Sequence, residues 1–287
     1  MILVTGAAGK TGLAVIKRLV AKGQRVRGLV RRQEQATELK QLGAAEFVVG
    51  DIGNRVTLDQ AAQGARAIYH ICPNMYPDEA SVGKNVIGAA QAAGIERFVY
   101  HSVLHPQIEV MPHHWQKMRV EEMLFESGMA CTILQPAAYM QNVLANWDHI
   151  VEQGEHVVPY GLETRLSMVD LLDVAEVAAN VLTDADHDGA TYELCANEIY
   201  SQNEIAKIIA SHLGRSVRGV VVTLDAWERE ARCAGLNDYA LETLLKMFRY
   251  YDEYGFWGNG RVLGWLLGRS PTTFSGFVER SIRGSSV

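Results

Sequence analysis

Two spacings of apolar residues alternate along the first half of the chain. Short apolar runs predict strands, and apolar residues three or four positions apart, as from Leu13 to Val20, predict helices. Strands that alternate with helices predict a parallel, doubly wound α/β sheet with helices on both faces. We expect strands at residues 2–5, 25–30, 46–49, 67–71, 97–101 and 131–134, and helices at 13–20, 34–42, 82–93 and 114–126.

The alternation loosens after Pro136. Helices are expected at residues 139–152 and 173–182, and a further strand at 191–195. Ser201 and Glu204 are spaced as in a capping box, which predicts a helix that begins there and ends at Gly214. We assign residues 1–136 to a first domain, to which the chain returns around residues 165–195. Residues 137–287 are assigned mainly to a smaller, helical region that binds the substrate.

Residues 224–287 have a helical pattern and are unusually aromatic. Packing in a helical cap or at a subunit contact is the favoured interpretation, because aromatic side chains fill cores efficiently. A wall of the substrate pocket is the alternative. The aromatic residues that stand close together are Phe248, Tyr250, Tyr251, Tyr254, Phe256, Trp257 and Trp265.

The composition is that of an ordinary globular protein. Of 287 residues, 48% are hydrophobic and 21% charged, and the net charge of -6 comes from charges of both signs mixed along the chain. Without a basic stripe, nucleic acid is excluded as a partner. The four cysteines stand singly, which indicates neither a metal site nor a disulfide framework. No apolar stretch is long enough to span a membrane, and we expect a cytoplasmic protein.

The strongest chemical signal lies between the first strand and the first helix, where residues 5–12 read TGAAGKTG. Gly6 permits backbone angles closed to other residues, Gly9 permits close approach of a pyrophosphate, and Gly12 lets the helix pack on the strand. The amides at the helix N-terminus then face the phosphates. This context predicts a Rossmann dinucleotide site rather than a plain glycine-rich turn. A mononucleotide P-loop would need glycine where Val4 stands, and we reject it.

The end of the second strand indicates which dinucleotide binds. NAD-specific folds place an acidic residue there, whereas this chain has Arg31 and Arg32. A guanidinium pairs with a 2'-phosphate, so NADP(H) is preferred over NAD(H); two solvated arginines are the alternative. Asp51, after the third strand, is placed either to accept from the adenine amino group or to stabilise a turn with Gly50.

Several segments together resemble the NmrA-like family of atypical short-chain dehydrogenases/reductases. They are TGAAGKTG, the GDI after the third strand, HSVLH after the fifth, HHWQKMRVEEMLFESGM, TILQPAAYMQN, SMVDLLDVAEVAANVL and LLGRSPTTFSGFV. The resemblance covers nearly the whole chain. It implies an NAD(P)-binding protein, although family members look to include quinone or dye reductases, ether reductases and dinucleotide-sensing regulators.

The resemblance also implies site residues. It implies that the pyrophosphate is held by Gly6, Ala8, Gly9, Lys10, Thr11 and Gly12, and the 2'-phosphate by Arg31. The adenine would be flanked by Asp51 and Ile52. The nicotinamide ribose would lie beside Ile71, Cys72 and Pro73, with its hydroxyls or the substrate within reach of Ser102 and Lys117. The residues near the nicotinamide would be Pro136, Ala137 and Tyr139.

The chain departs from the superfamily at the catalytic pair. The usual Tyr four residues before the Lys is His113 here, with Lys117 one helical turn later. His113 is a candidate proton donor, and a polar entry to the helix is its alternative. Ser102 and Tyr139 are the other catalytic candidates. Lys117 as a solvated helix residue, Ser102 as the end of a strand turn and Tyr139 as a buried anchor remain open.

Three functions are compatible with these residues. The first is an NADPH-dependent reductase that transfers hydride to an apolar conjugated acceptor such as a quinone or enone, which needs little acid catalysis. The second is a non-catalytic NADP(H)-sensing regulator with a protein partner, and the third, which no residue favours, is an isomerase or epimerase. We expect a small apolar or aromatic substrate, no metal, no membrane contact, and a monomer or a homodimer.

Overall fold

The computed structural model describes residues 1–284 and forms two compact units. The first unit contains Met1–Ile108, His113–Pro136 and Val174–Tyr192. The second contains Glu109–Pro112, Ala137–Asp173 and the chain from Glu193 onward. Apart from the short stretch Glu109–Pro112, the chain leaves the first unit after Pro136 and returns to it for most of one helix and the start of one strand.

The first unit is built on a seven-stranded sheet, which confirms the predicted α/β class. Its strand pairs are parallel, and the bonds from Ile133 N to Ala190 O (2.9 Å) and from Ala137 N to Leu194 O (3.0 Å) give the last strand the same direction. In spatial order the strands are β10 (Thr191–Leu194), β6 (Cys131–Pro136), β5 (Arg97–His101), β4 (Ala67–His70), β1 (Ile2–Val4), β2 (Val26–Val30) and β3 (Glu46–Val49).

The strand order reverses between β1 and β4, as in a doubly wound sheet. In such sheets the loops that follow the two central strands diverge, and ligands bind outside their carboxyl ends. Both strands are fully buried, in keeping with their nearly continuous apolar sequences. This edge of the sheet is therefore where the predicted site residues must be sought.

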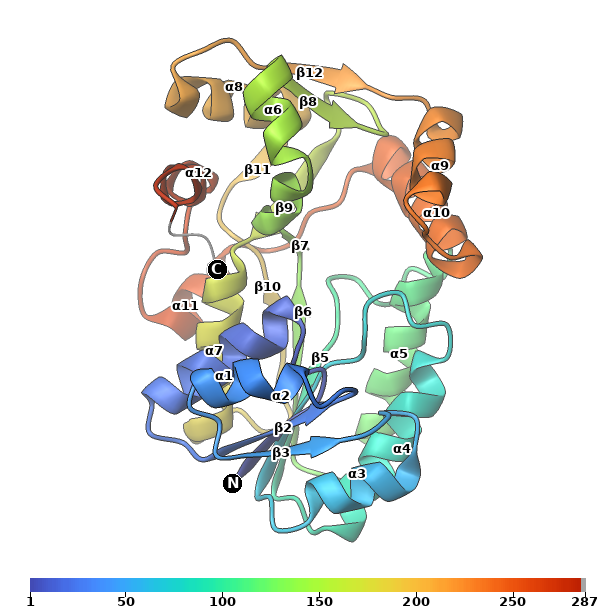
Figure 1. Ribbon diagram of the computed structural model, residues 1–287, viewed down its shortest axis with the longest axis vertical. Helices are drawn as coiled ribbons and strands as arrows, with labels where there is room; N and C mark the ends of the chain where they lie inside the picture. Colours follow the sequence, from blue (N-terminus) through green and yellow to red (C-terminus); the bar gives the residue numbers. More distant parts are fainter. Residues whose placement is uncertain (285–287) are drawn as a thin grey trace. The chain divides into compact units, whose positions relative to one another are not determined.

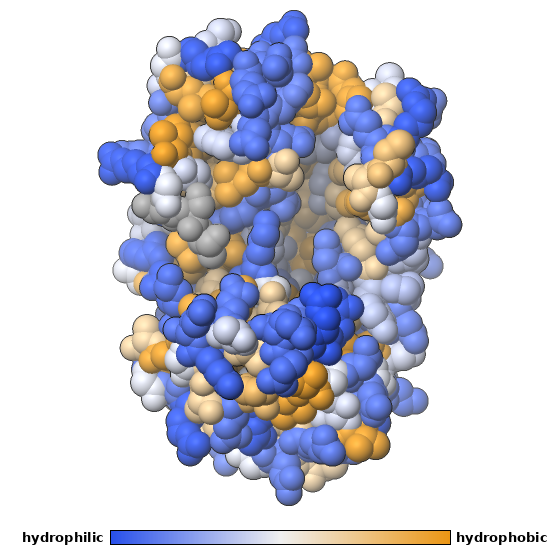
Figure 2. All heavy atoms as spheres, viewed as in Figure 1, coloured by the Kyte–Doolittle hydropathy of each residue, from blue (hydrophilic) through white to orange (hydrophobic). Residues whose placement is uncertain are grey.

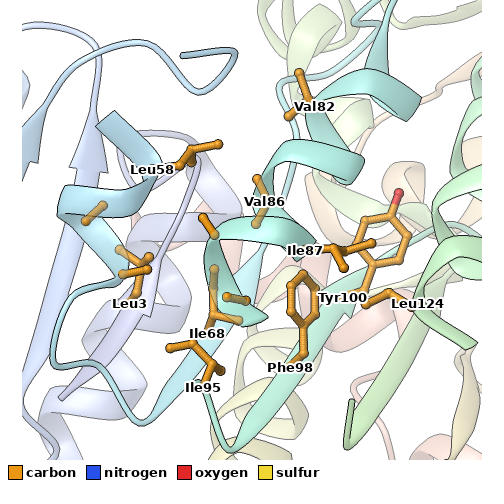
Figure 3. Packing of buried hydrophobic residues seen from close by; sticks show 14 of the residues in the cluster. Leu3, Leu58, Ile68, Val82, Val86, Ile87, Ile95, Phe98, Tyr100 and Leu124 are labelled. Atoms are coloured by element: carbon orange, nitrogen blue, oxygen red, sulfur yellow. The ribbon is translucent and has the colours of Figure 1, made fainter. Parts of the chain in front are cut away.

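Helices cover both faces of the sheet (Figure 1). On one face lie α1 (Lys10–Ala21), α2 (Gln35–Gln41) and most of α7 (Leu171–Thr183), and on the other lie α3 (Arg55–Ala62), α4 (Glu79–Ala92) and α5 (Pro112–Glu126). Figure 3 shows Ile68 and Phe98 of the sheet packed beside Val86 and Ile87 of α4. This apolar layer stabilises the packing of α3, α4 and α5 on the sheet.

The helix α3 was not expected from the sequence. Only Leu58, Ala61 and Ala62 of its eight residues are buried, and two of these are alanines, which hardly register in an apolar pattern. Val56 confuses the pattern further, because it is 65% exposed. The helix is instead started by Asn54, whose side chain accepts from Val56 N at 2.9 Å.

The second unit is mainly helical, with two small sheets. The order β11 (Ile199–Ser201), β9 (Arg165–Val169), β7 (Ala138–Tyr139) makes one sheet, and β12 (Arg218–Val221) pairs with β8 (Glu155–Val158) in the other. Its helices are η1 (Met140–Asn146), α6 (Trp147–Gln153), α8 (Gln202–Leu213), α9 (Leu224–Cys233), α10 (Asp238–Tyr254), α11 (Arg261–Leu267) and α12 (Phe274–Ile282).

Two expectations for this unit have different outcomes. The capping box is confirmed, because Ser201 and Glu204 exchange both bonds at the start of α8. The single helix at residues 139–152 is wrong. Tyr139 belongs to a strand, residues 140–146 form a 3-10 helix, and Asn146, with φ -117° and ψ 22°, interrupts the helical backbone before α6.

The aromatic residues of the C-terminal segment differ in burial, and Phe248 and Tyr250 are half-buried. Tyr251 and Phe256 are buried and lie 4.9 Å apart between ring centroids, which agrees with packing in a helical cap. Tyr254, Trp257 and Trp265 are exposed.

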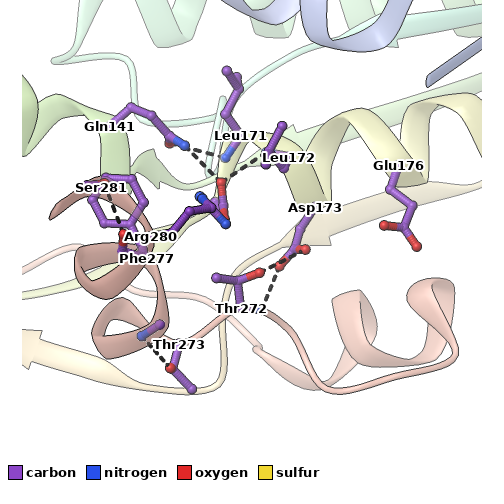
Figure 4. A network of polar contacts seen from close by, with 12 residues as sticks. Gln141, Leu171, Leu172, Asp173, Glu176, Thr272, Thr273, Phe277, Arg280 and Ser281 are labelled. Atoms are coloured by element: carbon purple, nitrogen blue, oxygen red, sulfur yellow. Dashed lines mark hydrogen bonds and ion pairs between the residues drawn. The ribbon is translucent and has the colours of Figure 1, made fainter. Parts of the chain in front are cut away.

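Two buried aspartates tie the C-terminal segment to the start of α7 (Figure 4). Asp170 is fully buried and accepts from Arg280 (2.6 Å), from Gln141 (2.8 Å) and from Leu172 N (3.0 Å). Asp173 accepts from Thr272 N at 2.7 Å. Because a buried carboxylate is stable only when it is paired and hydrogen-bonded, these contacts anchor residues 272–280.

We expect Arg280→Leu to lower the free energy of unfolding by about 2–3 kcal/mol, because it leaves the charge of Asp170 buried without a cation. Urea denaturation followed by tryptophan fluorescence measures this. Arg283→Leu, at the residue that caps the C-terminal end of α12, is the control; its pair with Glu279 is exposed, and a change below about 0.5 kcal/mol is expected. Equal losses in the two variants would contradict the anchoring role of Asp170.

Candidate functional site

The glycine turn after β1 is packed against the loop that follows β4. Gly6 has φ +58°, and a Cβ atom there would lie 2.8 Å from both the carbonyl oxygen and Cγ2 of Ile71. A Cβ on Gly12 would lie 2.9 Å from Ala7 O. Gly6 and Gly12 are thus required by the backbone and by helix packing. At Gly9 a Cβ would meet only Gly6 O, at 3.4 Å, so this position faces open space.

The N-terminus of α1 opens at this turn. Gly9 is its N-cap residue, and no side chain caps the helix or places an acidic group in its first turn. The first amides of a helix lack partners within the helix and carry a partial positive charge. Lys10 is exposed beside them. This arrangement suits an anion such as a diphosphate.

Thr5 joins the ends of the two central strands. Its hydroxyl accepts from Ile71 N at 3.0 Å, donates to Ile71 O at 3.2 Å and lies 2.9 Å from His70 Nδ1. His70 is fully buried, its Nε2 has no partner within residues 1–284, and burial lowers its pKa to about 3. These contacts fix the distance between the two loops at the reversal of the strand order.

The turn after β2 presents two guanidinium groups. Arg31 and Arg32 are exposed, and neither forms an ion pair with any carboxylate in the part of the chain that the structure describes. Their backbone amides both donate to Gln35 Oε1, each at 3.1 Å. Two unpaired cations on a fixed turn suit a second phosphate group.

Asp51 and Ile52 follow β3 and differ in exposure. Asp51 is exposed, and its Oδ1 accepts from Gly53 N at 2.7 Å, so the turn interpretation has a bond in its favour. Its second oxygen has no partner among the described residues and is available to a ligand. Ile52 is buried and belongs to the apolar layer beneath the sheet.

The loop after β4 contains Ile71, Cys72 and Pro73. Ile71 and Pro73 are half-buried, and Cys72 is buried. Burial raises the pKa of the Cys72 thiol, with the charge of Glu79 as the second cause. The thiol is therefore protonated and unreactive, and the loop can offer a ligand only contact surface and backbone groups.

Lys117 is held by a buried carboxylate. Its Nζ lies 2.7 Å from Glu79 Oε1, which also accepts from the Tyr100 hydroxyl at 2.9 Å, and it donates to His101 O at 3.4 Å. The Glu79 side chain is 3% exposed and that of Lys117 is 14% exposed. Lys117 is therefore not the solvated lysine that the sequence left open, and one of its three N–H groups remains for a ligand.

Ser102 is held by a second buried carboxylate, Glu121, one helical turn after Lys117 on α5. The Ser102 hydroxyl donates to Glu121 Oε1, and Gln135 Nε2 donates to both carboxylate oxygens at 3.0 Å. Burial raises the pKa of Glu121. Because the single Ser102 proton is engaged, this hydroxyl can only accept a hydrogen bond from a ligand.

His113 is buried at the start of α5 and packs edge-to-face on His114, with ring centroids 4.4 Å apart. Its Nδ1 has no partner within residues 1–284. Burial lowers its pKa to about 2, and the charges of His114 and Lys117 act in the same direction. His113 is therefore neutral near neutral pH, and it has no imidazolium proton to give.

The last three predicted residues follow β6. Pro136 ends the strand, and its carbonyl accepts from Leu104 N at 2.9 Å. Ala137 and Tyr139 belong to the second unit, where Ala137 is buried and Tyr139 is half-buried and pairs with Val169.

The partners of the predicted residues were missed at the sequence level. They are His70, Glu79, Tyr100, Glu121 and Gln135, all of them buried polar residues. The spacing of Glu121 four residues after Lys117 was the only available signal, since it places both on one side of α5. Glu79 follows Asp78, and two acidic residues in a row are typical of the solvated start of a helix. The sequence therefore gave no sign that Glu79 is buried.

The described residues contain no group of three His, Cys, Asp or Glu side chains that could hold a metal ion. No helix within residues 1–284 combines the length and apolar character needed to cross a membrane. Figure 2 shows hydrophilic residues over most of the face in view, interrupted by separate apolar patches.

Comparison with known proteins gives consistent matches. The model of the NmrA-like family matches residues 1–280. NAD(P)H azoreductase of Xenophilus azovorans is 29% identical over 281 residues, 97% of each chain. Quinone oxidoreductase 2 of Escherichia coli is 26% identical over 281 residues, 97% of this chain and 98% of that protein. The crystal structure of the Escherichia coli NADPH-dependent quinone oxidoreductase QOR2 with NADPH has a TM-score of 0.87 and 26% identity, covering 98% of this chain and 100% of the other.

The buried histidines make stability depend on pH. Burial lowers the pKa values of His70 and His101 to about 3, of His113 to about 2 and of His114 to about 4. Their ordinary value is 6.5, so below it only the unfolded chain takes up protons. Stability is therefore full above pH 6.5 and is lost as the pH falls, by up to about 1.4 kcal/mol per pH unit for each histidine.

Urea denaturation between pH 7 and pH 5 tests this dependence. In His113→Gln the slope of unfolding free energy against pH should be smaller than in the wild type by about 1 kcal/mol per pH unit on average over this range. His149→Gln, at an exposed position, is the control for the substitution itself. Identical slopes in the His113 variant and the wild type would show that His113 titrates alike in both states.

Proposed function

This chain belongs to the NmrA-like family, and we propose that it is an NADPH-dependent reductase that transfers hydride to an apolar conjugated acceptor such as a quinone. One observation carries the proposal. The uncapped N-terminus of α1 and the unpaired guanidinium groups after β2 both lie at the carboxyl edge of one sheet. The first suits a diphosphate and the second a further phosphate, which is the phosphate pattern of NADP(H).

The cofactor residues follow from this assignment. Gly9, Lys10 and the first amides of α1 bind the diphosphate, while Gly6 and Gly12 allow the turn to close. Arg31 binds the 2'-phosphate, and the free oxygen of Asp51 accepts from the adenine amino group. The site fits the cofactor at Gly9 in particular, where the backbone faces open space. When bound, NADPH supplies the hydride.

Ser102 and Lys117 bind the nicotinamide ribose in this proposal. Ser102 can only accept and Lys117 can only donate, so the two together suit vicinal hydroxyl groups, each of which does both. The buried carboxylates Glu79 and Glu121 hold these two side chains in place. Pro136, at the end of β6, is proposed to contact the nicotinamide.

We infer the acceptor class from the four buried histidines around Lys117 and from Tyr100, none of which gives up a proton readily near neutral pH. The pKa values of His70, His101, His113 and His114 are far below neutrality, and burial raises that of Tyr100 well above 10. An acceptor that delocalises the incoming charge does not need a proton in the same step, because solvent can supply it afterwards. Quinones and similar conjugated compounds meet that condition.

A non-catalytic NADP(H)-sensing role is the second candidate. It is favoured by one observation, which is that both polar side chains of the proposed ribose site are already bound to buried carboxylates. A sensor needs such a fixed binding site but no reacting group. It also needs different affinities for the reduced and oxidised cofactor, since equal affinities shift no equilibrium.

The purified protein should oxidise NADPH in the presence of a quinone or dye panel. We expect kcat/KM for the acceptor to stay within about threefold between pH 6 and pH 9, because neither the buried histidines near Lys117 nor Tyr100 titrate in that range. Tight NADPH binding without turnover of any acceptor would favour the sensing role. A bell-shaped pH profile would show that the reaction needs an ionising group of the protein, and it would contradict the proposed acceptor class.

The 2'-phosphate assignment predicts the effect of Arg31→Ser. We expect KM for NADPH to rise about 10- to 100-fold, as expected when a charge-assisted bond to phosphate is lost, with little change in KM for NADH. Arg25→Ser, at the other end of β2 and paired with Glu46, is the matched control and should leave both values unchanged. Equal effects of Arg31→Ser on the two cofactors would exclude Arg31 as a 2'-phosphate ligand.

A further inference from the structure

We infer that Gln35 determines the preference for NADP(H) over NAD(H), by holding the Arg31–Arg32 turn with a group that carries no charge. The inference rests on the proposed function, because it concerns the proposed 2'-phosphate site. Gln35 is the first residue of α2 and is half-buried. Nothing in the sequence singled it out.

The contact itself defines the chemistry. A single oxygen, Gln35 Oε1, accepts from the backbone amides of both Arg31 and Arg32 at 3.1 Å. Both partners are donors, so the amide oxygen must face the turn and the amide nitrogen must face away from it. The side chain thereby fixes the backbone from which the two exposed guanidinium groups project.

The uncharged state of this group is what matters for a phosphate. A glutamate could accept the same two backbone bonds with the same geometry, because its side chain has the same size and shape. It would add a negative charge directly behind the turn, next to the bound 2'-phosphate and to both guanidinium groups. The carboxylate would repel the 2'-phosphate, and it would pair with the guanidinium groups that otherwise bind this phosphate. NAD(H), which has a 2'-hydroxyl there, would not be repelled.

Gln35 is therefore a positioning residue with a role in specificity, and its two effects are separable. Gln35→Ala removes the acceptor of the two backbone bonds without adding charge. Gln35→Glu keeps the acceptor and adds charge. Gln41→Glu makes the same substitution at the exposed last residue of α2, about 9 Å farther along the helix axis, and is the matched control.

Isothermal titration calorimetry with NADP⁺ and NAD⁺ tests the inference without requiring turnover. We expect the wild type to bind NADP⁺ at least about 10-fold more tightly than NAD⁺. Gln35→Glu should weaken NADP⁺ binding about 10- to 100-fold and leave NAD⁺ within about threefold. Gln35→Ala should weaken NADP⁺ less than Gln35→Glu does, and Gln41→Glu should leave both affinities within about twofold.

The outcomes that overturn the inference differ from those that overturn the proposed function. If Gln35→Glu weakened the binding of both nucleotides equally, the ratio of the two affinities would be unchanged, and the role of Gln35 would be merely structural. If the variant weakened neither, the inference would also be wrong. If the wild type bound neither nucleotide, the dinucleotide site itself would be wrong, and the inference would fall with it.

Discussion

The loops that follow β1 and β4 approach each other so closely that residue 6 has no room for a Cβ atom. Ile71 O and Ile71 Cγ2 would each lie 2.8 Å from such an atom, and the backbone of Gly6 has φ +58°. The Thr5 hydroxyl fixes this approach through its bonds to Ile71 and His70. The start of α1, the open space at Gly9 and the direction of the first helical amides all depend on it.

Around this turn the exposed cations Lys10, Arg31 and Arg32 lie where the phosphates are expected, and the buried ionisable groups are paired or neutral. Glu79 and Glu121 engage Lys117 and Ser102, while burial keeps the neighbouring histidines uncharged. Such a site binds a phosphorylated ligand firmly and in one orientation, because its polar groups are already fixed. Its histidines and Tyr100 give up no proton readily near neutrality, and this limits the chemistry that the site could support.

The sequence predicted those parts of the fold and of the candidate site that depend on neighbouring residues. The strands of the parallel sheet have continuous apolar runs, and the capping box of Ser201 and Glu204 lies within four residues. The strand β8 was missed because its four residues, EHVV, contain only two apolar residues in a row. Glu79 was missed because its partners Tyr100 and Lys117 are brought to it only by the fold. The sequence shows that His113 replaces the usual Tyr. Whether His113 can donate a proton depends on its burial, which the sequence does not show.

The most direct measurement of the central claim is amide hydrogen exchange with and without NADP⁺. If the turn after β1 binds the diphosphate, the amides of residues 9–12 should exchange more slowly in the complex. The amides of residues 31–35 should also exchange more slowly, because the 2'-phosphate lies against them. The amides of β12, in the second unit, serve as an internal reference. Unchanged exchange at residues 9–12 under saturating NADP⁺ would contradict the account.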